Sequence, residues 1–141
     1  MNIAQKQFQS VRIIHIAFVF AALVYCGVPF LIVPTASNSP ALPMIVVFGV
    51  IALSTWMAGF FIRIRMVKPA EEALRSNPED GAAAARWRMG VVLSLTFCET
   101  VLLFGFALKI LGASWNVCGV FYGVGIFFLL LWAPRLELPP A

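Results

Sequence analysis

The sequence predicts an all-α integral membrane protein, a four-helix bundle with both termini in the cytoplasm (N-in, C-in). The first reason is composition: 62% of the 141 residues are hydrophobic and 11% are charged, whereas a soluble domain is about half apolar and about a quarter charged. The second is four apolar runs of about 20 residues, the length that crosses a bilayer as a helix. The third is that lysine and arginine gather on one side of these runs, as they do in cytoplasmic loops.

A single transmembrane domain, 1–141, contains the four runs, which cover approximately 11–33, 42–62, 87–111 and 115–133. The first run follows Lys6 and Arg12 and is longer than the apolar part of a signal peptide, so we expect a retained helix. The uncharged stretch 34–43 is rich in turn formers and predicts a short loop. Gly112 is expected to end the third helix, and Pro134 the fourth.

The charged segment 63–86 is predicted to be a cytoplasmic loop that leads into the third helix. Its sequence Ser76-Asn77-Pro78-Glu79-Asp80 resembles a helix start, with a capping side chain, proline at the first helical position and acids in the first turn. We therefore expect one continuous helix from about Pro78 to Leu111, with its first two turns in the cytoplasm.

Lysine and arginine counts give the orientation. The N-terminal flank has two, the segment between the second and third runs has six, the C-terminal flank has one, and the loop 34–43 has none. Both termini and the charged segment are therefore predicted to be cytoplasmic, in a multi-pass protein of the inner (plasma) membrane. Trp87, Trp115 and Trp132 fall at the predicted interfaces, and Lys109 is expected to reach the outer surface.

Glu99 is the residue that suggests a mechanism. It lies about ten residues, or roughly 15 Å, inside the third run, near the middle of the bilayer. An ionisable group there is unfavourable by several kcal/mol, so it usually faces a partner, a cavity or an ion path, and desolvation favours its neutral form. Two interpretations stay open: a proton-binding site shaped by Thr96 and Thr100, or a neutral hydrogen-bonder that joins helices. For each hydroxyl taken singly, a bond to its own backbone is the favoured interpretation.

Other residue types exclude several functions. Cys26, Cys98 and Cys118 lie inside apolar runs without CxxC spacing and are expected to be apolar fillers, although a bridge between Cys26 and Cys118 stays open. His15, the single histidine, is expected to be a hydrogen-bonder near the interface. We predict no metal site, no cofactor and no enzyme activity, because no nucleophile–base pair or cofactor motif is present. The net charge of +4 collects at the ends of apolar runs, which argues against nucleic-acid binding.

The fourth run contains a GxxxG pair, Gly119 and Gly123, with Gly125 following. This spacing lets two helix backbones approach closely. We therefore expect these glycines to pack helices.

Between Glu71 and Leu111 the sequence has a turn, Arg75-Ser76-Asn77-Pro78, and then a helix with an acid, Glu99, followed six residues later by Gly105. This pattern resembles the proteolipid (c) subunit of rotary ATP synthases, in which an Arg-Gln-Pro or Arg-Asn-Pro cytoplasmic turn precedes an ion-carrying Asp or Glu. The second run has fewer glycines than that family, and two further helices flank the matched region. The whole chain also resembles small four-helix bacterial membrane proteins.

The resemblance implies a c-like proton-handling subunit in which Glu99 binds and releases a proton and Arg75, Asn77 and Pro78 form the cytoplasmic turn. One alternative is a non-catalytic structural or accessory subunit of a larger membrane complex. Another is a small oligomeric transporter with Glu99 as its coupling site. The expected partners are the lipid bilayer and other membrane subunits or further copies of the chain.

Overall fold

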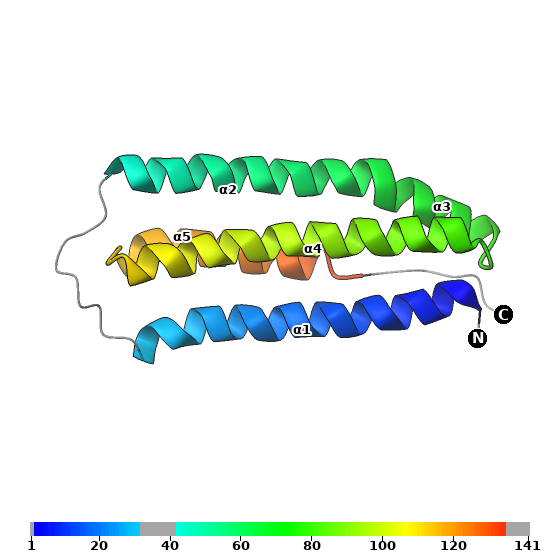
Figure 1. Cartoon of the computed structure of the whole chain (residues 1–141), viewed down its shortest axis with the longest axis horizontal. Coiled ribbons are helices and arrows are strands. Elements are labelled where there is room, and N and C mark those ends of the chain that lie inside the picture. Colours follow the sequence, from blue (N-terminus) through cyan, green and yellow to red (C-terminus); the bar gives the residue numbers. More distant parts are fainter. Residues whose placement is uncertain (1, 32–41, 135–141) are drawn as a thin grey trace.

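The computed structural model describes residues 2–31 and 42–134. In these ranges the chain is helical, without strands, and four long helices lie side by side (Figure 1). The elements are, in chain order, α1 (Ile3–Leu31), α2 (Leu42–Ile62), the π-helical turn η1 (Arg63–Val67), α3 (Lys68–Ser76), α4 (Gly81–Ile110) and α5 (Trp115–Leu131). The predicted loop 34–43, apart from its last two residues, and the tail from Arg135 onward lie outside the described residues.

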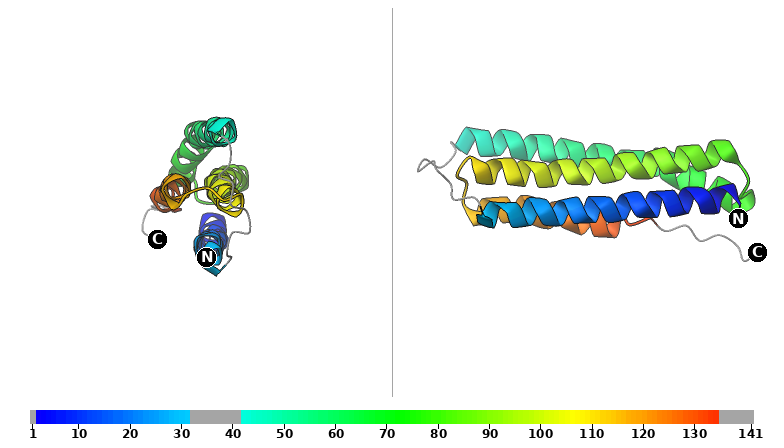
Figure 2. Two further views of the ribbon diagram at one scale, coloured as in Figure 1. Left: turned by 90° about the vertical axis from the view of Figure 1, so that its left-hand side faces the viewer. Right: turned by 60° about the horizontal axis from the view of Figure 1, so that its bottom comes forward.

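Helix α4 is the centre of the bundle. It packs against α1, α2 and α5, and the end-on view in Figure 2 shows the other helices arranged around it. Its fully buried side chains include Trp87, Leu95, Leu102 and Leu108. Of the three helices long enough to cross a membrane, α4 is the one with the largest buried share, which suits its central place.

The prediction of a loop over 63–86 is wrong for its first half, because the chain stays helical from Arg63 to Ser76. Helix formers in α3, among them Ala70, Glu71 and Leu74, explain the continuation. Pro69 has no N–H to donate and would clash with the preceding turn of an α-helix. The π-turn η1, in which the Lys68 N–H donates to the Arg63 carbonyl, lets the chain pass this proline without unwinding.

The start of the third predicted helix is also corrected. Helix α4 begins at Gly81, not at Pro78, and its N-cap is Asp80, whose carboxylate accepts hydrogen bonds from the N–H groups of Ala82 and Ala83. Asn77 instead ends α3. The Ser76 hydroxyl donates back to carbonyls of α3, which leaves Asp80 to cap α4, so the turn lies at 77–80.

The predicted end of this helix at Gly112 is confirmed. Gly112 has a φ of 89°, which a residue without Cβ adopts freely. The N–H of Ala113 donates to Leu108 and that of Gly112 to Lys109, so the last carbonyls of α4 are paired in a Schellman motif. The next helix, α5, begins three residues later, antiparallel to α4 (Figure 1).

Exposed large apolar side chains occupy one continuous zone, which we name the apolar belt. In the described residues it comprises the segments 13–31, 42–64, 89–111 and 115–131, and only Ile3 lies outside it. No exposed Asp, Glu, Lys or Arg falls within these segments. Three of the helices are long and apolar enough to cross a membrane, and α5 is a shorter apolar helix, of about 26 Å at 1.5 Å per residue.

The three tryptophans expected at interfaces differ in their surroundings. Trp115 is 40% exposed at the start of α5, where the Lys109 ammonium lies 4.5 Å from its ring centroid. Trp87 is completely buried, and its indole N–H donates to Glu71 at 3.1 Å. Trp132 is 6% exposed, so Trp115 alone of these three presents an exposed ring, and helix α3 covers Trp87.

Candidate functional site

Glu99 lies in the middle of the apolar belt. Ten residues of α4 separate it from Met89 and eleven from Ile110, the two ends of the belt on this helix, so it is roughly 15 Å from either edge. Its side chain is half-buried. The carboxyl therefore lies midway along the apolar belt, as its predicted depth requires.

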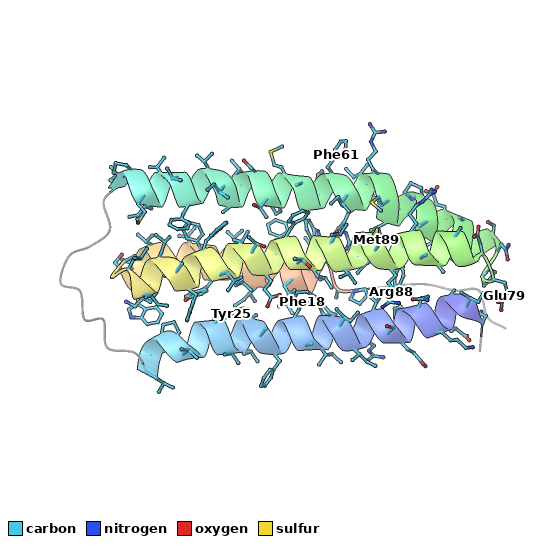
Figure 3. All side chains as sticks on the ribbon, viewed as in Figure 1. Phe18, Tyr25, Phe61, Glu79, Arg88 and Met89 are labelled. Atoms are coloured by element: carbon cyan, nitrogen blue, oxygen red, sulfur yellow. The ribbon has the colours of Figure 1, made fainter. Side chains whose placement is uncertain are left out.

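Tyr25 of α1 is the polar neighbour of Glu99. The phenol and the Glu99 carboxyl are near enough to influence each other electrostatically, and Figure 3 shows Tyr25 between α1 and α4. The Tyr25 ring also packs against Phe106, which lies seven residues beyond Glu99 on α4, with ring centroids 5.9 Å apart. A phenol can donate to a carboxylate and accept from a carboxylic acid, so Tyr25 suits both protonation states of Glu99.

A proline inside α1 links this pair to a third helix. Pro29 has no N–H and so leaves the carbonyl of Tyr25, four residues earlier, without its helical partner. The Tyr122 hydroxyl of α5 donates to that carbonyl at 3.2 Å. Gly105 makes room for the Tyr122 ring, because a Cβ there would lie 3.2 Å from it. The two tyrosines of the chain therefore lie at one junction of α1, α4 and α5.

Thr96 and Thr100, predicted to shape the site, bond to their own helix instead. The Thr96 hydroxyl donates to the Val92 carbonyl at 3.0 Å, and the Thr100 hydroxyl donates to the Thr96 carbonyl at 2.9 Å. Each hydroxyl has one hydrogen, which this bond uses. The threonines can therefore accept a hydrogen bond from Glu99 but cannot donate one to it.

No cation acts on Glu99 among the residues that the structure describes. Lys109, ten residues beyond Glu99 on the same helix, donates to the Ala113 carbonyl at 3.2 Å. His15 bonds through Nε2 to the Leu129 carbonyl at 3.0 Å, which agrees with its predicted role as a hydrogen-bonder. Without a counter-charge, a carboxyl in an apolar zone is favoured in its neutral form.

The end of α5 is held by two of its neighbours. The last carbonyls of a helix have no partner within it, and here His15 of α1 binds that of Leu129, while Arg63 of η1 donates to the Trp132 carbonyl at 3.3 Å. The Arg63 guanidinium also lies 5.5 Å from the centroid of the Trp132 ring. Positive charge at a helix C-terminus is favourable, so this contact fixes where α5 stops.

The glycines of the GxxxG pair do not pack against this chain. A Cβ on Gly119 or Gly123 would meet nothing within 4 Å, whereas a Cβ on Gly125 would lie 2.6 Å from Leu102. Within the chain, the close approach of α5 to α4 therefore depends on Gly125. Cys26, Cys98 and Cys118 all carry free thiols, so the bridge left open by the sequence is absent.

The predicted cytoplasmic turn is distant from Glu99. Arg75 belongs to the last turn of α3, and Asn77 and Pro78 form the connection to α4. The Pro78 carbonyl accepts from the Ala4 N–H at 3.2 Å, which ties the start of α1 to this turn. Glu99 is 18 residues beyond Gly81 along α4, or roughly 27 Å, so the turn and the carboxyl are separate sites.

Comparison with known proteins gives no relative: no family model, no curated protein and no solved structure matches the chain. The function is therefore argued from the geometry of Glu99 and its neighbours. Sequence reasoning missed Tyr25 and Tyr122. A signal was present, since Pro29 in an apolar run frees the carbonyl of residue 25, which then needs a donor from another helix.

Proposed function

We propose that the chain is a four-span protein of the bacterial inner membrane with both termini in the cytoplasm. The apolar belt supports this, because its exposed surface suits lipid and contains no exposed charge in the described residues. Basic side chains such as Arg12, Arg65 and Arg88 lie just beyond one edge of the belt, the distribution typical of a cytoplasmic face.

Within this protein, Glu99 is a proton-binding carboxyl of a c-like membrane subunit. The observation that carries this proposal is the pairing of Glu99 with Tyr25 in the middle of the apolar belt, without a cation among the described residues. The neutral acid is favoured by desolvation. When the proton leaves, the Tyr25 phenol donates to the carboxylate and stabilises the charge. A reversible proton site requires both states to be tolerated.

Association with further membrane subunits or copies of the chain belongs to the same proposal. The proton has to enter and leave Glu99, and a cationic residue on a partner subunit would favour its release by stabilising the carboxylate. The outward-facing Gly119 and Gly123 leave open space on α5, where another helix backbone can approach closely.

The test is proton flux into vesicles that contain the purified protein, either alone or with the membrane proteins that copurify with it. Glu99→Gln keeps the shape and the hydrogen-bonding capacity of the neutral acid but cannot release a proton, so it is expected to abolish flux. Glu72→Gln, in exposed α3, is the matched control and is expected to leave flux unchanged. Normal flux through Glu99→Gln would refute the proposal.

A second candidate is a structural subunit in which Glu99 is a permanently neutral hydrogen-bonder. The junction of Glu99, Tyr25 and Tyr122 favours it, because these groups connect three helices, and polar contacts of this kind hold membrane helices together. A carbodiimide separates the two functions. Reaction at Glu99 that responds to pH indicates proton exchange, whereas an inert Glu99 in a folded protein indicates the structural role.

A further inference from the structure

A groove of about 410 Å³ runs between α1 and α4 at the cytoplasmic edge of the apolar belt. It is distinct from the Glu99 site, and it differs in character from one end to the other. The residues that line it are Gln7 and Ile14 of α1 and Ala85, Arg88, Met89, Val92 and Leu93 of α4. None of these lining residues is acidic.

The polar end of the groove is formed by Arg88 and Gln7. Arg88 is exposed, and its Nη1 donates to the Gln7 side-chain oxygen at 3.3 Å. The bond joins Arg88 of α4 to α1 across the groove, and Figure 3 shows Arg88 in the space between these two helices. A guanidinium has five N–H donors in a fork that fits phosphate oxygens, and the bond to Gln7 uses one of them.

The other end of the groove is apolar. Ile14, Val92 and Leu93 line this end together with Met89, whose side chain is 60% exposed. Met89 is the first exposed apolar residue of the belt on α4, and Ile13 is the first on α1. The groove therefore crosses the edge of the belt, with its basic end outside and its apolar end inside. Arg88 and Leu93 are five residues apart, or roughly 7.5 Å along the axis.

We infer that this groove binds an anionic phospholipid, with the phosphate at Arg88 and Gln7 and the start of an acyl chain along Ile14, Val92 and Leu93. Charge complementarity selects the headgroup, since the groove has one cation and no acid. The change from basic to apolar over a few ångströms matches a phospholipid at the glycerol level, and basic pockets between helices on the cytoplasmic side bind such headgroups. The inference rests on membrane insertion of the proposed function and does not depend on Glu99.

The experiment is native mass spectrometry of the protein released from vesicles of phosphatidylglycerol and phosphatidylcholine in equal amounts. The wild-type protein is expected to retain phosphatidylglycerol in preference. Arg88→Gln is expected to weaken this retention about fivefold, the effect of one basic side chain at an anionic surface. Ala85→Leu keeps every charge and fills the groove, so it is also expected to reduce retention, and it tests the site independently if Arg88→Gln does not fold.

Arg65→Gln is the matched control. Arg65 is an exposed arginine near the same edge of the belt, on η1, and its guanidinium lies over the Phe61 ring; it does not line the groove. Its replacement removes the same charge and is expected to leave retention unchanged. Equal losses in Arg65→Gln and Arg88→Gln would indicate general surface charge and overturn the site. Three further results would also overturn the site: full retention in Ala85→Leu, equal retention of both lipids, or complete displacement by inorganic phosphate. Failure of insertion would appear separately, as loss of the protein from the vesicles.

Discussion

Gly125 is the position at which α5 comes closest to α4, and Gly125→Ala tests this packing. The added Cβ would lie 2.6 Å from Cγ and 2.7 Å from Cδ2 of Leu102, which is fully buried. Overpacking of this kind costs about 1–3 kcal/mol. Removing a glycine from a helix interior contributes about 1 kcal/mol in the opposite direction, so the two effects have to be separated.

Gly123→Ala separates them, because Gly123 is in the same helix and a Cβ there meets nothing within 4 Å. Both variants gain the same helix propensity, but only Gly125→Ala meets Leu102. The free energy of unfolding, measured by titration of mixed micelles with a denaturing detergent, is expected to be about 1–3 kcal/mol lower for Gly125→Ala than for Gly123→Ala. A Gly125→Ala protein as stable as Gly123→Ala would show that α4 and α5 do not pack as described.

The same unfolding titration, with helix content followed by circular dichroism, tests two further contacts. Tyr122→Phe removes the donor to the Tyr25 carbonyl and is expected to lower the free energy of unfolding by about 0.6–1.7 kcal/mol. In a Pro29→Ala background the helix supplies its own donor to this carbonyl, so the loss should disappear. An undiminished loss in that background would contradict the role of Pro29. Asp80→Ala removes the N-cap of α4 and is expected to cost about 1 kcal/mol. Ser76→Ala, in the sequence that predicted the helix start, is expected to leave the free energy of unfolding almost unchanged. A larger loss in Ser76→Ala than in Asp80→Ala would place the helix start at Pro78.

The helices were most predictable from the sequence in the segments that are expected to lie in lipid. Runs of apolar residues bounded by charge predicted the segments at 11–33, 42–62, 87–111 and 115–133, and Gly112 was correctly identified as a helix end, because its φ of 89° favours glycine. The charged segment was predicted poorly. Charge indicated a loop after Ile62, but the π-turn at Arg63–Val67 accommodates Pro69 and the helix continues.

The candidate site was only partly predictable for a different reason. The depth of Glu99 follows from its distance along one helix, which can be counted directly in the sequence. Its neighbour Tyr25 depends on how α1 and α4 are rotated about their axes, and a helix that is apolar on all faces carries little sign of that rotation. The same ambiguity explains why Gly119 and Gly123 were expected to pack helices while Gly125 makes the contact within the chain.

The central claim is that Glu99 is a protonated carboxyl in contact with Tyr25 that exchanges its proton. Infrared spectroscopy of the protein in lipid at neutral pH tests it most directly, through the carbonyl stretching band of a carboxylic acid. The account predicts such a band, which shifts in D₂O and with Tyr25→Phe and is absent in Glu99→Gln. A spectrum without that band, or a band that Glu99→Gln leaves in place, would contradict it.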